Sequence, residues 1–245
     1  MRRILFRWRG ITVWSYPAML YVGLVVGVFA GNAAAHASGL DPFRTFVASI
    51  ILFIPALIGA RLLFVASHWD IYRADLPRIW DRSDGGQAMY GGLPSALLVS
   101  VPLLAALRLP FGAFWDIGAI TILTGMIFTR FGCLLNGCCA GRPSDKWFSV
   151  YLPNARGVWQ KRVPTQYLEA AWATVLLVSA IGLWHSMPFR GGLLVFVTAG
   201  YCSGRLVLES MREHFHGARG FTIQHAISVC MIVSSIAVLT ARWPR

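Results

Sequence analysis

Seven apolar stretches, each close to the length of a membrane span, limit what this chain can fold into. A helix needs about 20 mostly apolar residues to cross a bilayer. The candidate spans cover roughly residues 12–33, 46–67, 91–109, 112–129, 166–187, 190–209 and 222–241. The sequence therefore predicts an all-α, polytopic integral membrane protein with about seven transmembrane helices. We interpret residues 1–245 as a single transmembrane domain.

The composition also favours a membrane protein. Of the 245 residues, 56% are hydrophobic and 13% are charged, whereas soluble domains carry about 25% charged residues. The net charge of +12 comes from 22 basic residues scattered between the apolar stretches, with no dense basic block. We therefore expect contact with anionic lipid head groups and no nucleic-acid partner. The basic start, MRRILFRWRG, precedes no small-residue cleavage site, so we expect no secretory signal peptide.

Two long polar connections, residues 68–90 and 130–164, should lie on the same side of the membrane, because two predicted spans separate them. With the N-terminus outside, five basic residues would lie on the inner side and fifteen on the outer side. The positive-inside rule alone therefore favours the opposite orientation, with the N-terminus inside.

Charged residues inside the predicted spans mark a candidate site. Arg61 lies in the second span, and the sixth span contains the segment GYCSGRLVLESMRE. Four polar residues of that segment follow one another at helical spacing and form a stripe: Tyr201, Arg205, Glu209 and Arg212. An unpaired charge inside a membrane costs several kcal/mol, so such residues face a cavity or one another.

Two interpretations fit this stripe. In the first, Arg205 and Glu209 form a structural ion pair that pins two helices together. In the second, Arg61, Arg130 and Arg205 line an anion site. A phosphate group would neutralise their charge, and arginine forks bind phosphate oxygens in pairs. A lipid phosphate is the nearest plentiful candidate.

A polar, glycine-rich segment, TRFGCLLNGCCAGRP (residues 129–143), follows the fourth apolar stretch. Its glycines let the backbone turn and approach a ligand closely. The segment resembles the signature of the prolipoprotein diacylglyceryl transferase family, bacterial enzymes that attach a diacylglyceryl group to the lipobox cysteine of lipoprotein precursors. The family form is approximately G-R-x-G-N/C-x-x-N/A-G-x-x-x-G, and this chain reads T-R-F-G-C-L-L-N-G-C-C-A-G.

Further blocks carry the same resemblance, in the family's order along the chain. VWSYPAMLYVGL is similar to the family's W-Y-G-L-M-Y, IGARLLFV to its G-G-R helix, and RIWDRSDGGQAMYGGL to its W-x-G-G-x-S-F-H-G-G segment. RVPTQYLEA is similar to H-P-S/T-Q-L-Y-E, GYCSGRLVLESMRE to G-Y-x-x-x-R-x-x-x-E-x-x-R, and FTIQHAISVCMIV to the closing helix. Together these blocks cover most of the chain.

The resemblance implies site residues and substrates. The matching catalytic positions are Arg130, Arg205, Tyr90 and Glu209. The matching substrate-binding positions are Tyr16, Arg61, Asn136, Gly141, Gln166, Glu169 and Tyr201. The implied substrates are phosphatidylglycerol and the lipobox in the signal peptide of a prolipoprotein. No cofactor or metal is required.

The resemblance also implies a location. It predicts a multi-pass protein of the bacterial cytoplasmic (inner) membrane, in contact with membrane lipid, whose polar extracytoplasmic loops surround a lipid-binding cavity. The N-terminus would face outward and the active site would face the periplasm. We follow this orientation over the count of basic residues, since several outer arginines would bind the ligand.

Two positions depart from the family pattern. Tyr90 stands where the family's S-F-H-G-G segment has a histidine, and Val163 stands where its H-P-S-Q segment has another. A tyrosine hydroxyl has a pKa of about 10 and is a poor base at neutral pH. Three interpretations follow: Tyr90 only orients the donor, another group such as Glu209 takes the proton, or the activity has changed. Burial and the neighbouring Arg205 would act on Glu209 in opposite directions, so the sequence leaves its role open.

The five cysteines also allow several interpretations. Cys133, Cys138 and Cys139 share the signature segment, whereas Cys202 and Cys230 lie in apolar spans. The C-x4-C-C spacing fits no common zinc module and no histidine is near it in sequence. Our default interpretation is therefore the packing of small residues in a tight loop. A disulfide from Cys133 to Cys138 or Cys139 is the alternative in an oxidising periplasm.

Two hypotheses about function remain open. In the first, the chain transfers the diacylglyceryl group of phosphatidylglycerol to the lipobox cysteine of prolipoproteins and releases glycerol phosphate. In the second, it is a divergent relative that binds or transports anionic phospholipid, or modifies a different acceptor.

Overall fold

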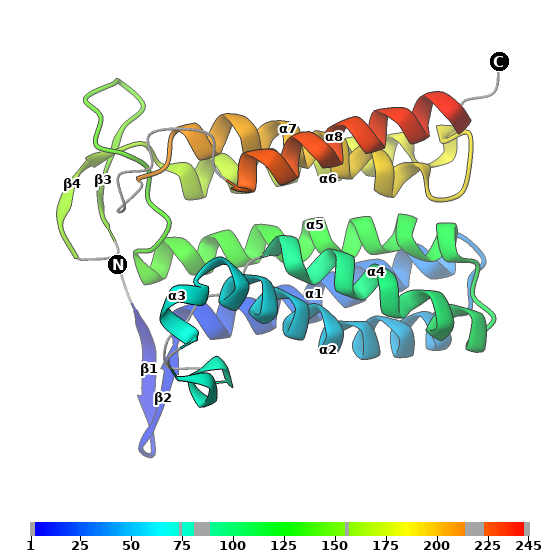
Figure 1. Cartoon of the computed structure of the whole chain (residues 1–245), viewed down its shortest axis with the longest axis horizontal. Coiled ribbons are helices and arrows are strands. Elements are labelled where there is room, and N and C mark those ends of the chain that lie inside the picture. Colours follow the sequence, from blue (N-terminus) through cyan, green and yellow to red (C-terminus); the bar gives the residue numbers. More distant parts are fainter. Residues whose placement is uncertain (1–2, 74, 81–88, 155–156, 214–222, 243–245) are drawn as a thin grey trace. The chain divides into compact units, whose positions relative to one another are not determined.

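The computed structural model describes residues 3–73, 75–80, 89–154, 157–213 and 223–242. Within these residues, one long helix forms at each predicted span (Figure 1). The long helices are Ser15–Ala37 (α1), Pro42–Ser67 (α2), Met89–Ala106 (α4), Phe111–Asn136 (α5), Thr165–Leu183 (α6), Gly192–Ser210 (α7) and Ile223–Arg242 (α8). Shorter helical turns are Trp69–Tyr72 (α3), Leu76–Trp80 (η1) and Trp184–Ser186 (η2). The prediction of a helical, polytopic membrane protein is confirmed.

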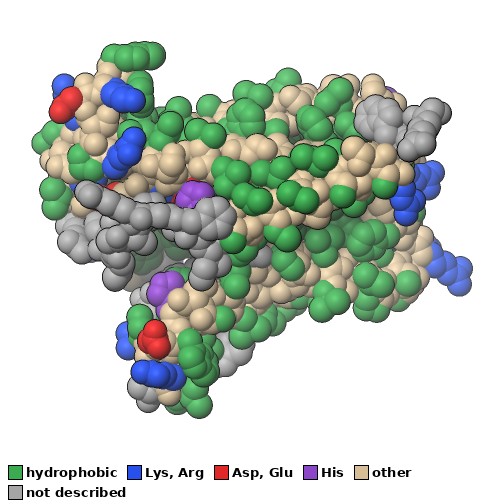
Figure 2. All heavy atoms as spheres, turned by 45° about the horizontal axis from the view of Figure 1, so that its top comes forward, with side chains coloured by type: hydrophobic (Ala, Val, Ile, Leu, Met, Phe, Trp, Pro, Cys, Tyr) green, Lys and Arg blue, Asp and Glu red, His purple; other side chains and the backbone are tan. Residues whose placement is uncertain are grey.

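The long helices have the length and surface of membrane spans. Six of the described helices are long and apolar enough to cross a membrane, and the apolar part of α4, Gly91–Ala106, is shorter. Large apolar side chains on different helices are exposed, Leu98 at 75%, Val178 at 65% and Val233 at 61%. In Figure 2, apolar side chains cover the middle of the visible face, and charged side chains lie toward its left and right margins. Extended exposed apolar surface of this kind is typical of helices that face lipid.

The chain divides into two compact units. The first comprises Met1–Ala34 and Trp115–Arg245, and the second comprises Ala35–Phe114. The first unit therefore holds most of α1 and α5 together with α6, α7 and α8, whereas the second holds α2, α3, η1 and α4. The single domain expected from the sequence stays a prediction.

Small residues bring α1 and α5 together in the first unit. A Cβ atom on Gly23 would lie 2.8 Å from the carbonyl oxygen of Gly125, and one on Gly27 would lie 2.7 Å from that of Thr121. Any side chain at these glycines would push the helices apart. Small residues four apart allow this close backbone approach in membrane proteins. In the same unit, α7 packs against both α6 and α8 (Figure 1).

The second unit is built on α2 and α4. Asp41 caps the N-terminus of α2, where its carboxylate accepts a hydrogen bond from the backbone N–H of Arg44 at 3.0 Å. Pro42 occupies the first turn, where no backbone donor is needed. The two helices approach closely at Gly59, because a Cβ atom there would lie 2.5 Å from the carbonyl oxygen of Gly91.

Two short β-hairpins were not anticipated by the sequence analysis. Ile4–Trp8 (β1) pairs antiparallel with Ile11–Trp14 (β2), and Val150–Pro153 (β3) pairs antiparallel with Trp159–Arg162 (β4). The first turns at Arg9 and Gly10, both with positive φ, as a two-residue hairpin turn requires. The second lies in the polar connection after α5 and leads into the start of α6.

Candidate functional site

The buried carboxylate of Glu169 forms ion pairs with three arginines. Glu169 lies near the start of α6 and is 3% exposed. Nε of Arg130, on α5, lies 2.5 Å from its Oε2. Arg205 of α7 and Arg212, just beyond α7, donate to its Oε1 at 2.7 and 2.9 Å. These ion pairs join α5, α6 and the end of α7, and a carboxylate is tolerated in such a buried place because it is paired.

Glu209 adds a second carboxylate on α7. Its Oε2 lies 2.6 Å from Nη2 of Arg205 and 3.8 Å from Nε of Arg212. The Arg205–Glu209 pair therefore forms within one helix, as the i,i+4 spacing predicts. It is the pair between Arg205 and Glu169 that links two helices. The interpretation that Arg205 and Glu209 pin two helices together is therefore wrong, because both residues lie on α7. The interpretation as an anion site stays a prediction.

The guanidinium of Arg130 has one described ion-pair partner, Glu169. Its Nε contacts Glu169, and no other described residue bonds to its Nη1 or Nη2. Its side chain is 11% exposed. The three guanidinium groups of Arg130, Arg205 and Arg212 face the two carboxylates of Glu169 and Glu209, so these five side chains carry a net charge of +1. The two Nη groups of Arg130 are coplanar donors in a positively charged cluster. Such a pair can bind two oxygens of one anion, such as a phosphate.

Two tyrosines predicted for the site border this cluster. Tyr201 lies one turn before the arginine of α7 and interacts electrostatically with Arg130 and Glu169. Tyr16 lies in the first turn of α1 and interacts electrostatically with Arg130. A Cβ atom on Gly132 would lie 3.0 Å from Cβ of Met19 and 3.5 Å from Cδ2 of Tyr16, so the glycine lets this part of α1 pack closely against α5.

The signature segment turns sharply at the end of α5. Asn136 is the last residue of α5, and its carbonyl accepts a hydrogen bond from Nε of Arg3 at 3.2 Å. Gly137 follows with φ of 73°, the left-handed conformation that commonly ends a helix. At Gly141 a Cβ atom would lie 2.5 Å from the carbonyl oxygen of Val163. Only glycine therefore fits where this segment passes the chain that enters α6.

The start of α6 clamps the same segment. Nε2 of Gln166 donates to the carbonyl of Cys138, and Oγ1 of Thr165 donates to the carbonyl of Cys139, both at 2.7 Å. Gln166 is 2% exposed, so it serves the loop from a buried position. Gln166, a predicted site residue, therefore stabilises the conformation of the signature loop.

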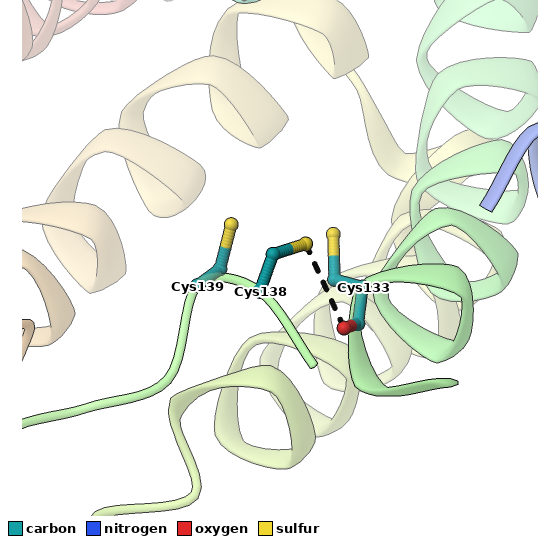
Figure 3. Close-up of side chains that lie close together, drawn as sticks. All are labelled: Cys133, Cys138 and Cys139. Carbon is teal, nitrogen blue, oxygen red and sulfur yellow. Dashed lines mark hydrogen bonds between the residues drawn. The ribbon is translucent and has the colours of Figure 1, made fainter. Parts of the chain in front are cut away.

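Three thiols of the signature segment lie close together (Figure 3). The sulfur atoms of Cys133, Cys138 and Cys139 are within 4.8 Å of one another. All five cysteines of the chain are free thiols in the structure, so the disulfide considered above is not formed here. Hydrogen bonds with the thiols of Cys133 and Cys138, and then the charges of Arg212 and Arg130, lower the pKa of the Cys139 thiol against the opposing effect of burial.

Some site residues were not among the sequence candidates. Arg212 belonged to the predicted stripe but not to the predicted binding set. Burial acts to lower the pKa of its guanidinium, but the charges of Glu169, Cys139 and Glu209 together outweigh that effect and raise the pKa. Arg162 of β4 is fully buried, with its Nη1 2.9 Å from Oε2 of Glu213 and 3.3 Å from the carbonyl oxygen of Gly141. No helical spacing signals Arg162, because it reaches the site from a hairpin.

Asp116 was also missed. It lies in the first turns of α5, is 6% exposed, and accepts hydrogen bonds from the backbone N–H groups of Gly191, Leu193 and Leu194 at 2.7, 2.9 and 3.2 Å. A carboxylate at a helix N-terminus satisfies free donors and complements the helix dipole. Asp116 therefore anchors α7, which carries the arginine stripe. Its signal in the sequence was an acidic residue within an apolar span.

Arg61 belongs to the second unit, where its described contacts are structural. Its Nε donates to the carbonyl of Ile79 at 2.8 Å and its Nη2 donates to that of Arg78 at 3.3 Å. Its guanidinium lies over the ring of Tyr72, 5.5 Å from the centroid. These contacts hold the connection that follows α2. An anion-binding role for Arg61 stays a prediction.

Tyr90 can be placed only through its backbone, which lies in the first turn of α4. Its side chain, and residues 81–88 of the same sequence block, lie outside the described residues. The role of Tyr90 therefore stays a prediction from the sequence.

Comparisons with known proteins extend the sequence resemblance. The model of a family described as "Prolipoprotein diacylglyceryl transferase" matches residues 3–241. A phosphatidylglycerol–prolipoprotein diacylglyceryl transferase of Geobacillus kaustophilus (strain HTA426) is 28% identical over 247 residues, covering 95% of this chain and 89% of the relative. A protein with the same name from Streptococcus pyogenes serotype M5 (strain Manfredo) is 28% identical over 237 residues, covering 93% of this chain and 90% of the relative.

Proposed function

Because the chain belongs to the prolipoprotein diacylglyceryl transferase family, we propose that it transfers the diacylglyceryl group of phosphatidylglycerol to the lipobox cysteine of a prolipoprotein. One structural observation supports this proposal most. Arg130 belongs to a buried cluster of net charge +1, and Glu169 is the only described residue that pairs with its guanidinium. The phosphate diester of phosphatidylglycerol carries one negative charge and two oxygens that can accept this fork.

We assign the donor's phosphate to Arg130 and Arg205. Glu169 holds Arg130 from its Nε side, which orients the Nη fork, and it holds Arg205 at 2.7 Å. Glu209 fixes Arg205 from within the same helix. Donors that are held in place before the reaction need no reorganisation when charge develops in the transition state. The two carboxylates therefore act as positioning residues for the arginines.

The reaction is a displacement at carbon. The acceptor thiol loses its proton to water, and the thiolate sulfur attacks C3 of the donor's glyceryl unit. The C–S bond forms while the bond from C3 to the phosphate oxygen breaks, and the electron pair leaves with glycerol phosphate. Negative charge grows on that leaving group, where Arg130 and Arg205 stabilise it. No covalent intermediate with the enzyme is formed.

Glu209 is a poor choice as the proton acceptor. Its Oε2 lies 2.6 Å from Arg205 and 3.8 Å from Arg212, and protonation would weaken both ion pairs. The positive charge of the cluster instead favours the thiolate of the acceptor, because a nearby cation lowers a thiol's pKa. Tyr90 orients the donor through its hydroxyl group. The remaining candidates border the site or shape its loop: Tyr16, Asn136, Gly141, Gln166 and Tyr201.

We place the enzyme in the bacterial cytoplasmic membrane, with its lipid-binding cavity open to the periplasm, where the acceptor cysteine is presented. The apolar helices support a multi-pass membrane protein. A cysteine introduced at Ser83 in a chain without its native cysteines should react with an impermeant thiol reagent added outside, and a reporter fused after Arg245 should be cytoplasmic. Protection of Ser83→Cys in intact cells, with labelling after lysis, would contradict this orientation.

Complementation tests the activity. The gene is expressed in a strain depleted of its own diacylglyceryl transferase, and growth is followed together with transfer of labelled diacylglyceryl groups to a lipobox peptide. We expect growth rescue and labelled peptide. Binding of phosphatidylglycerol vesicles without rescue or transfer would favour the second hypothesis, a lipid-binding relative that has lost the chemistry.

A further inference from the structure

Three thiols converge where α5 ends. Cys133 is buried, Cys138 and Cys139 are half-buried, and their sulfur atoms lie within 4.8 Å of one another. In Figure 3 the three sulfur atoms lie on the same side of the loop, and Cys138 is turned toward Cys133. Sulfur atoms that share one metal ion, at bonds of about 2.3 Å, lie about 4 Å apart. A small movement of these side chains would therefore let them share one ion.

The backbone holds the three thiols together before any ligand arrives. The N–H of Cys138 donates to the carbonyl of Cys133 at 3.1 Å and closes the turn. Cys139 has φ of 62°, a left-handed conformation that residues with a side chain rarely adopt. The clamps from Thr165 and Gln166 hold the carbonyls of Cys139 and Cys138 in this conformation. Strain of this kind collects at ligand clamps and functional loops.

The donor atoms of this group are all sulfur. Among the described residues no histidine, aspartate or glutamate joins the three cysteines. Structural zinc sites are almost always four-coordinate, so this set would leave zinc one protein ligand short. Soft thiolates also select Cu(I), a d10 cation that is stable with three of them. Arg212 and Arg130 act electrostatically on Cys139, and their charge offsets part of the negative charge of a copper–thiolate unit.

We propose that Cys133, Cys138 and Cys139 form a binding site for one soft monovalent metal ion, Cu(I). The C-x4-C-C spacing matches no common metal module, so it does not by itself predict a metal site. The proposal rests on two structural observations. The three sulfur atoms converge, and the loop that carries them is held in a strained conformation. The site shares the charges of Arg130 and Arg212 with the proposed phosphate site, but metal binding is measured without transfer, so either proposal can fail without the other.

A competition titration tests the site. The full-length chain is purified in detergent, reduced, freed of reductant without exposure to air, and titrated with Cu(I) against a chromogenic Cu(I) chelator. We expect one Cu(I) per chain to be withheld from the chelator. Loss of a residue that only orients a metal ligand weakens metal binding about ten- to 100-fold. Loss of a ligand itself should weaken Cu(I) binding further, and we expect this in each of Cys133→Ser, Cys138→Ser and Cys139→Ser.

The two remaining cysteines provide matched controls. Cys230 is an exposed thiol on α8 and Cys202 is a buried thiol on α7. Cys230→Ser and Cys202→Ser should keep one bound Cu(I) with unchanged affinity. The proposal is overturned if the wild-type chain withholds no Cu(I), or if the three cluster variants bind as tightly as the controls. A parallel titration with Zn(II) and a zinc indicator overturns the choice of ion if zinc is held more tightly than Cu(I).

Discussion

Arg61 and Arg130 are both buried arginines in apolar helices, yet their surroundings differ in kind. Arg61, on α2, donates to the backbone carbonyls of Ile79 and Arg78 and lies over an aromatic ring. Arg130, on α5, contacts the carboxylate of Glu169 through Nε, and no other described residue bonds to its Nη groups. The first arrangement uses the guanidinium to hold a connection. The second pairs the guanidinium with a carboxylate, and we propose that its Nη groups bind the phosphate of the donor.

The difference shows that burial of an arginine in a membrane helix does not by itself identify a binding site. Backbone carbonyls neutralise no charge, but they satisfy donors and fix a chain segment. Carboxylates neutralise charge and orient the guanidinium, so an excess of arginines over carboxylates leaves an anion site. The partner atoms therefore distinguish the two roles, and sequence position alone does not.

The largest expected effect is the loss of transfer in Arg130→Ala. Removing the fork and its charge should lower turnover by about 1000-fold or more, beyond the loss of a single transition-state donor. Arg130→Lys should rescue poorly, because lysine is a point charge without the planar fork. Arg205→Ala should behave like Arg130→Ala. The measurement is transfer of labelled diacylglyceryl groups to a lipobox peptide.

Arg44→Ala is the matched control for Arg130→Ala. Arg44 lies in the second unit with its side chain 48% exposed beside Asp41, so its removal should leave turnover near the wild-type value. Wild-type turnover in both Arg130→Ala and Arg205→Ala would show that these arginines do not bind the donor's phosphate. Arg130 would then have a structural role, as Arg61 does.

The second effect concerns folding stability. Glu169→Gln leaves three guanidinium groups with one charged partner, so the free energy of unfolding should fall by about 3 kcal/mol or more. Chemical denaturation in lipid nanodiscs measures the change. Asp41→Asn, which makes the same chemical change at an exposed helix cap, should stay close to the wild type. Equal stability of Glu169→Gln and Asp41→Asn would show that Glu169 is not the centre of the cluster.

The third effect tests whether the second unit contributes to the chemistry. If the hydroxyl of Tyr90 donates a hydrogen bond to the substrate, Tyr90→Phe should lower turnover by roughly ten- to 1000-fold. Tyr90→His should then be tolerated near neutral pH, where imidazole is the better base. Transfer is measured from pH 6 to 9, with Tyr151→Phe on the exposed face of β3 as the control. An unchanged rate and pH profile for Tyr90→Phe would remove Tyr90 from the site.

The smallest effect is expected at Arg61. Arg61→Lys keeps the charge but loses the paired bonds to backbone carbonyls, each of which contributes about 1 kcal/mol to stability. Turnover should fall less than tenfold, and stability should fall by a similar small increment. If Arg61→Lys loses transfer as severely as Arg130→Lys, then Arg61 also binds the donor and the comparison between the two arginines fails.

The spans could be predicted because each is an apolar run of nearly full length, and every predicted span has its helix. The hairpins could not, since strands such as Ile4–Trp8 are short and lie beside strong helix signals. The stripe around Arg205 followed from helical spacing alone. The position of Glu169 between three arginines depends on how α5, α6 and α7 pack, and a single sequence contains no signal for that packing.

The charge of the five-residue cluster also affects how stable the folded protein is in the cell. A ligand that binds only the folded state adds to stability in proportion to the logarithm of its concentration over its Kd. An anionic lipid bound to the cluster would therefore neutralise its remaining positive charge, as a third carboxylate would, and stabilise the folded protein. A cell that runs short of anionic lipid would then lose the protein itself, through unfolding and degradation, as well as the donor it consumes.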